Sequence, residues 1–143
     1  MASQLSRCIP AALFALSLPI AVHAAALDSA AKKQTDTATV HAGMALGATE
    51  LKMAHAHLHH VINCLVGPAG KGFDAKAEDP CKGMGQGAIA DAKGDAKAEM
   101  HLHTALKEAE KGLKTTTLAA AHADAQQTMK TLQGADAGAN GSG

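Results

Sequence analysis

The positions of the helix-breaking residues constrain this chain more than any other feature. No proline lies between residues 28 and 66 or between residues 89 and 132, whereas the segment 67–87 holds two prolines and a cluster of glycines. Proline and glycine disfavour helix interiors, while alanine, which supplies about a quarter of the chain, is the strongest helix former. The sequence therefore predicts two helical blocks on either side of one loop.

Each block contains a signal for a turn. Gly47 is followed by Thr49, and Gly112 is followed by Thr115. Glycine commonly ends a helix and threonine commonly caps the next one. The pattern predicts four helices, near 27–46, 49–66, 88–111 and 115–133.

These helices are expected to form an all-α, antiparallel four-helix bundle over residues 25–133, because none of them can bury its apolar stripe alone. A hairpin of two very long helices is the alternative. Few large side chains are present, so the core should be lined with alanine and the helices should lie close together. The tail 134–143 (GADAGANGSG) has the composition of a disordered segment.

The first residues, 1–24, have the organisation of a signal peptide. One arginine precedes an apolar run over residues 8–22, and residues 22–24 offer small side chains at the −3 and −1 positions of a cleavage site. A membrane anchor is the weaker reading, since two prolines interrupt the run. The sequence predicts a periplasmic or secreted protein with no membrane segment after cleavage.

Signal cleavage changes the cysteine content. Cys8 is removed, which leaves Cys64 and Cys81 as a pair in an oxidising compartment. A disulfide between them would close the loop between the second and third helices and stabilise the fold by about 3 kcal/mol. The alternative is that Cys64 binds a metal as a thiolate together with His60, one helical turn earlier.

Composition also excludes or weakens several classes of function. The chain has 13 basic and 13 acidic residues, two Phe and no Trp or Tyr, which argues against a nucleic-acid partner. No catalytic triad order, paired catalytic carboxylates or cofactor fingerprint is present, so we expect no enzyme. A haem-binding bundle remains an alternative, although the CxxCH motif and aromatic residues for a porphyrin face are missing. A structural or stress-related exported protein with incidental histidines is the other.

Histidines lie on or beside the apolar stripe of every predicted helix. At 100° per residue, His55, His103 and His122 fall on or near the stripes, with His41 and His59 at stripe edges. Counting from the turns places His41 level with His55 and His103 level with His122. If the two pairs share one level, His55, His103 and His122 converge in the core. His41 or His59 would then be a fourth ligand.

The methionines favour a particular metal. Imidazole suits copper, zinc and nickel, and Met44, Met100 and Met129 lie on the same stripes as the histidines. A mixed imidazole and thioether set favours a copper ion, with nickel or zinc as alternatives. The other interpretation is that these methionines fill gaps in a core without aromatic residues.

A second set of histidines is predicted on the outer side of the second helix. His57 and His60 lie there with Met53 and Cys64, and His101 lies on the outer side of the third helix. A looser metal site could form at the surface, in which His55 and His59, or His57 and His60, act as a pair one helical turn apart. Solvated polar side chains are the alternative.

Three segments carry a family resemblance: HAHLHH at 55–60, EMHLH at 99–103 and AAAHADA at 119–125. With the export signal and small size, they resemble the small periplasmic His-rich metal-binding proteins of proteobacteria. The resemblance implies a monomeric four-helix bundle that takes up several copper, nickel or zinc ions without catalysis. We therefore expect an exported metal buffer or carrier, with an unidentified metallochaperone or efflux system as its partner.

Overall fold

The structure, a computed structural model, describes residues 29–140 of the chain. It contains α1 (Ser29–Gly47), α2 (Leu51–Val66), the short α3 (Ala88–Asp91), α4 (Ala96–Gly112) and α5 (Leu118–Asn140). No strand occurs within this part of the chain, so the predicted all-helical fold is confirmed. The predicted signal peptide, 1–24, lies outside the described residues. No helix between residues 29 and 140 has the length and apolar character needed to cross a bilayer.

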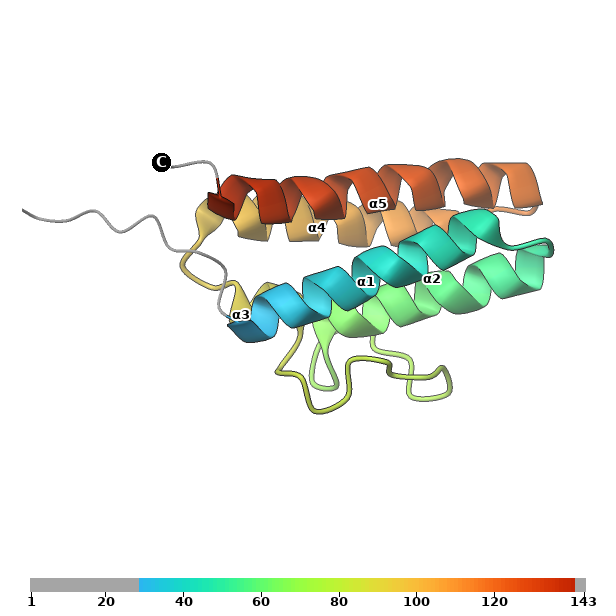
Figure 1. The fold of residues 1–143 in the computed structure, drawn as a ribbon. Helices are drawn as coiled ribbons and strands as arrows, with labels where there is room; N and C mark the ends of the chain where they lie inside the picture. Colours follow the sequence, from blue (N-terminus) through green and yellow to red (C-terminus); the bar gives the residue numbers. More distant parts are fainter. Residues whose placement is uncertain (1–28, 141–143) are drawn as a thin grey trace, which may run out of the picture.

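The four long helices lie side by side as two helical hairpins (Figure 1). α1 packs against α2 and α5, while α4 packs against α5 and α2. Alanine lines much of the interior, as predicted, and only a few larger side chains are completely buried, among them Leu58, Leu65, Leu102 and Leu132. Small interfacial residues allow helix axes to approach closely. The core is therefore narrow.

The buried face of α1 differs from the predicted one. Met44 was expected on the inner face, but Met44 is 47% exposed and Val40, one turn earlier, is 56% exposed. The residues that face the core are alanines at helical spacing: Ala31, Ala38, Ala42 and Ala45, all fully buried. The prediction was wrong because it followed the bulky residues, whereas close helix packing selects the small ones.

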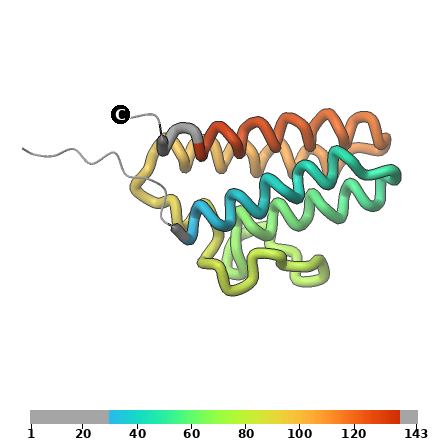
Figure 2. Tube along the Cα trace, in the orientation of Figure 1, coloured from blue at the N-terminus to red at the C-terminus, as the bar shows by residue number. Residues whose placement is uncertain are grey.

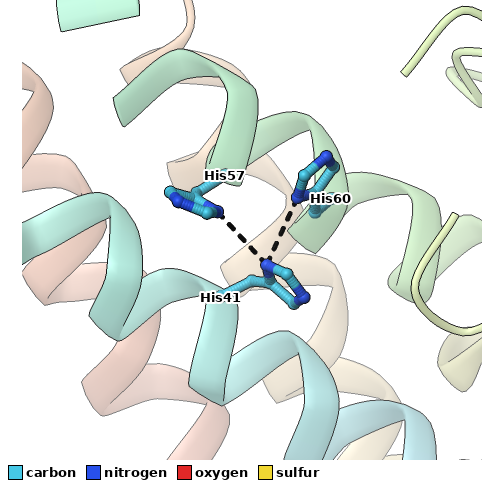
Figure 3. A group of neighbouring side chains, drawn as sticks. All are labelled: His41, His57 and His60. Carbon is cyan, nitrogen blue, oxygen red and sulfur yellow. Dashed lines mark hydrogen bonds between the residues drawn. The ribbon is translucent and has the colours of Figure 1, made fainter. Parts of the chain in front are cut away.

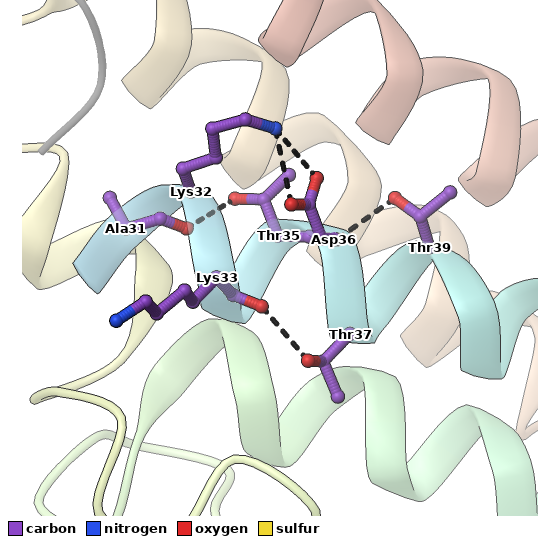
Figure 4. Close-up of polar contacts among 7 residues, drawn as sticks. All are labelled: Ala31, Lys32, Lys33, Thr35, Asp36, Thr37 and Thr39. Carbon is purple, nitrogen blue, oxygen red and sulfur yellow. Dashed lines mark hydrogen bonds and ion pairs between the residues drawn. The ribbon is translucent and has the colours of Figure 1, made fainter. Parts of the chain in front are cut away.

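Polar residues are tolerated in α1 because they bond within the helix (Figure 4). Thr35, which is fully buried, donates its hydroxyl to the Ala31 carbonyl at 2.8 Å. Thr37 and Thr39 donate in the same way to the carbonyls four residues earlier. These bonds satisfy hydroxyls that would otherwise be costly to bury.

The predicted third helix, 88–111, is broken into α3 and α4. Gly94 has a φ of 105°, a conformation that glycine adopts easily, and Asp95 caps α4 by accepting hydrogen bonds from the backbone N–H groups of Lys97 and Ala98. The glycine and aspartate that mark this break were overlooked because no proline accompanies them.

The last helix is displaced toward the C-terminus relative to its prediction. It begins at Leu118, after the Thr117 hydroxyl accepts a hydrogen bond from the Ala120 N–H. It continues to Asn140 through much of the segment expected to be disordered, and residues 141–143 are not described. Ala135 is buried in the core, so packing against the other helices favours a helix that composition alone does not predict.

The segment 67–87 runs along the flank of α2, as Figures 1 and 2 show. The predicted disulfide between Cys64 in α2 and Cys81 in this segment is present, and their Cα atoms are 5.2 Å apart. Cys64 is therefore not a thiolate ligand in this structure. Because the segment covers α2 from outside, the C-terminal half of this helix, 60–66, is buried on all sides.

Candidate metal centre

Three histidines converge between α1 and α2 (Figure 3). His41 comes from α1, and His57 and His60 come from successive turns of α2. The Nδ1 atom of His41 lies 3.3 Å from Nδ1 of His57 and 3.3 Å from Nδ1 of His60. One nitrogen from each ring lies within 4.8 Å of both others. The three histidines, termed the His triad below, are close enough to hold a metal ion.

The spacing of these nitrogens matches a coordination sphere. Metal–nitrogen bonds of about 2.0–2.1 Å in tetrahedral geometry place two ligand nitrogens about 3.3 Å apart. Both contacts of the His41 nitrogen have this length. The ligand nitrogens of His57 and His60 also lie within 4.8 Å of each other, so all three nitrogens surround one point. The triad leaves further coordination positions open, since it supplies three ligands.

Hydrogen bonding alone does not satisfy this arrangement. A neutral imidazole nitrogen carries either one proton or one lone pair. Nδ1 of His41 faces two other Nδ1 atoms, so it cannot form a full hydrogen bond with both. A cation between the three rings would use all three lone pairs at once.

Burial and neighbouring charges favour the neutral forms of His41 and His60. Burial lowers the pKa of His41 and of His60 from 6.5, and the neighbouring imidazoles lower both further. The Glu78 carboxylate opposes this shift in each pKa but does not reverse it. Neutral imidazoles are the form that binds metals, so few protons must be displaced near neutral pH.

Helix geometry explains why these residues meet. His41 and His57 are each eight residues from Thr49, in the turn between α1 and α2, so they lie at the same height in the hairpin. His60 follows His57 by three residues and so shares its face of α2. It is 9% exposed because the segment 67–87 covers this side of the helix.

The predicted core site does not form. His103 is exposed. Nε2 of His122 lies 2.8 Å from the Ala48 carbonyl oxygen, so this side chain ties α5 to the turn after α1. Nε2 of His55 is buried without a hydrogen-bond partner among the described residues. No group of three ligands that includes these histidines is found in residues 29–140.

The predicted methionine ligands do not share the expected inward orientation. Met44 and Met100 are 47% and 59% exposed, in contrast to their expected inward orientation. Met129 is half-buried and packs against the core. The inward thioethers that favoured copper are therefore lost at Met44 and Met100, and Met129 fits the gap-filling interpretation.

Three residues beside the histidines were missed at the sequence level. Asp74 and Glu78 approach His59 and His60, with N–O distances of 3.5 Å and 4.0 Å. Asn63, fully buried in α2, is bonded to the backbone of both acidic residues. The sequence offered one indication that the loop lies here, namely that Asn63 is next to Cys64. A disulfide at Cys64 draws the loop toward this part of α2.

Comparison with known proteins identifies no relative. No family model matches the chain, and no curated protein or solved structure matches it significantly. Function must therefore be inferred from the site itself.

Proposed function

We propose that this chain is an exported metal-binding protein that holds a transition-metal ion on the His triad and acts as a buffer or carrier. The observation that carries the proposal is the convergence of three ring nitrogens from two helices, with two separations of 3.3 Å. Three neutral imidazoles are a favourable ligand set for copper, zinc and nickel ions.

Copper is the metal we favour, with nickel and zinc as alternatives. Sites with nitrogen ligands generally bind Cu²⁺ more tightly than Zn²⁺ or Ni²⁺. Met44 and Met53 lie about one helical turn from His41 and His57, and both are exposed. Thioethers at these positions would supply soft ligands for Cu(I) as it approaches the triad.

The fold and the proposed location agree with this role. We infer that the two helical hairpins form an antiparallel four-helix bundle, a frame that can hold imidazoles at fixed distances. The disulfide supports an oxidising compartment, in keeping with the predicted signal peptide. We propose a monomer without catalytic activity, which passes its ion to a metallochaperone or efflux system.

Calorimetric titration of the mature protein with Cu²⁺, Ni²⁺ and Zn²⁺ tests the proposal. At about pH 7.5, where free imidazole is neutral, we expect tight binding with the highest affinity for copper. His41→Gln and His57→Gln should each abolish binding at the triad. His103→Gln is the matched control, because this exposed histidine lies outside the triad. Unchanged binding in both triad variants would overturn the proposal and leave a structural role for the histidines.

A further inference from the structure

A second group of metal-binding side chains lines a groove between α2 and the segment 74–78. The groove has a volume of about 660 Å³, and the candidate ligands on its walls are His55, His59, His60, Asp74 and Glu78. The histidines come from α2 and the carboxylates from the segment that covers it.

Asn63 fixes the carboxylate wall of this groove. Its amide group donates hydrogen bonds to the carbonyls of Asp74 and Glu78, at 3.0 and 3.1 Å, and accepts one from the Asp74 N–H at 2.9 Å. One buried side chain thus anchors both acidic residues to the helix that carries the histidines. Preorganisation of this kind reduces the ordering that ligand binding would otherwise require.

Asp74 is oriented for coordination. Its Oδ1 atom accepts a hydrogen bond from the Lys76 N–H at 2.9 Å, which leaves Oδ2 directed to His59. Oδ2 lies 3.5 Å from Nδ1 of His59, a separation close to that of two ligands on one tetrahedral ion with bonds of about 2.0–2.2 Å. Both side chains are about one-third exposed, at 37% and 35%, so an ion can reach them from solvent.

His60 forms a common wall between the groove and the His triad. Its Nδ1 atom faces His41, whereas its Nε2 atom lies 4.0 Å from the Glu78 carboxylate. Glu78 is 88% exposed and can therefore turn toward either His59 or His60. Lys52 and Lys76 also line the groove and balance the two carboxylates in charge, so coordination rather than net charge would hold a cation there.

We propose that this groove is a second metal site, which binds a divalent transition-metal ion through His59 and Asp74, with the exposed Glu78 turning inward as a further ligand. The mixed nitrogen and oxygen ligands suit Zn²⁺, Ni²⁺ or Cu²⁺. The site is separate from the His triad and is more open to solvent. A metal ion bound there lies next to His60 and can exchange with solvent more readily than one at the triad.

Titration with Zn²⁺ alone, on the mature disulfide-bonded protein, distinguishes the two sites. We expect the parent protein to bind two equivalents. His59→Gln combined with Asp74→Asn should lose one equivalent, because Asn keeps the Oδ1 acceptor for Lys76 but removes the carboxylate. His41→Gln should lose the other equivalent, and His103→Gln should lose none. Circular dichroism confirms that each variant is folded.

The outcomes separate this inference from the function proposed above. A single equivalent that is lost in His41→Gln and retained in the groove variant would overturn the second site and leave the triad intact. A single equivalent that is lost only in the groove variant would support the groove and overturn the triad. Nitrogen-detected NMR provides an independent readout, since Zn²⁺ at the groove must shift Nδ1 of His59 but not the ring nitrogens of His103.

Discussion

Asn63 is predicted to be a major determinant of both the fold and the metal-binding surface. Asn63→Ala removes three hydrogen bonds between α2 and the segment that covers it. At about 1 kcal/mol for each bond, the free energy of unfolding should fall by about 3 kcal/mol. Asn63 is fully buried, so no water replaces its amide group without rearrangement. The intact disulfide keeps the segment tethered but does not fix Asp74 or Glu78.

Urea denaturation followed by far-ultraviolet circular dichroism measures this loss, with the disulfide intact in both proteins. Thr128→Ala is the matched control, because it removes one buried hydroxyl whose bond, to the Asp124 carbonyl, lies within α5. We expect this control to lose about 1 kcal/mol. Hydrogen exchange provides a local readout, since the Asp74 N–H donates to Asn63 and should exchange faster in the variant. A loss no larger than that of the control, with unchanged exchange, would refute the reasoning.

Three further predictions address the disulfide, the helix contacts and pH. Replacing both disulfide cysteines by alanine opens a loop with a sequence separation of 17 and should lower the free energy of unfolding by about 3 kcal/mol. Equal urea midpoints for the disulfide-bonded parent and the alanine variant would contradict this. Gly112→Ala should lower the free energy of unfolding by about 1–3 kcal/mol, because the added Cβ would lie 2.7 Å from a methyl group of the buried Leu58 in α2. Gly47→Ala is the control and should leave the urea midpoint unchanged, because nothing lies within 4 Å of its added Cβ. Because the pKa values of His41 and His60 are lowered in the folded protein, the unfolded chain binds more protons than the folded chain below about pH 6.5. The free energy of unfolding should therefore be highest above that pH and should decrease as the pH falls through the folded-state pKa values. Urea midpoints measured between about pH 7.5 and 5 should show this decrease for the parent and a smaller decrease for His41→Gln. The same dependence of the midpoint on pH in both proteins would show that His41 does not contribute to it.

Much of the fold could be predicted from local signals. The proline-free stretches predicted helices, and the cysteine pair predicted the disulfide that is present. Orientation of each helix was less predictable. α1 presents alanines to its neighbours and leaves Val40 exposed, because the distance between helices, which a single sequence does not reveal, decides which side chains fit.

The candidate site was only partly predictable for a related reason. All three triad residues were recognised as possible ligands, but they were divided between an inner and an outer group. That division assumed one buried face on α2, whereas α2 is covered by α1, by α4 and by the segment 67–87. The outer face of α2 is therefore an interface with the segment 67–87 and not a solvent-exposed surface. His60 is buried in this interface.

The narrow core also explains why metal ligands gather on one side of the molecule. Close contacts made by alanine leave little room for an imidazole in the centre of the core, so the histidines lie at the ends and edges of the helix interfaces. His122 reaches the turn after α1, and a Cβ on Gly134 would lie 3.3 Å from the ring of His101, which shows how closely that ring packs on α5. In the part of the chain that the structure describes, α2 has a covering loop that adds both volume and carboxylates beside its histidines. Metal binding should therefore depend on the attachment of this loop. Asn63→Ala, which leaves every proposed ligand in place, should weaken Zn²⁺ binding at the groove more than binding at the triad.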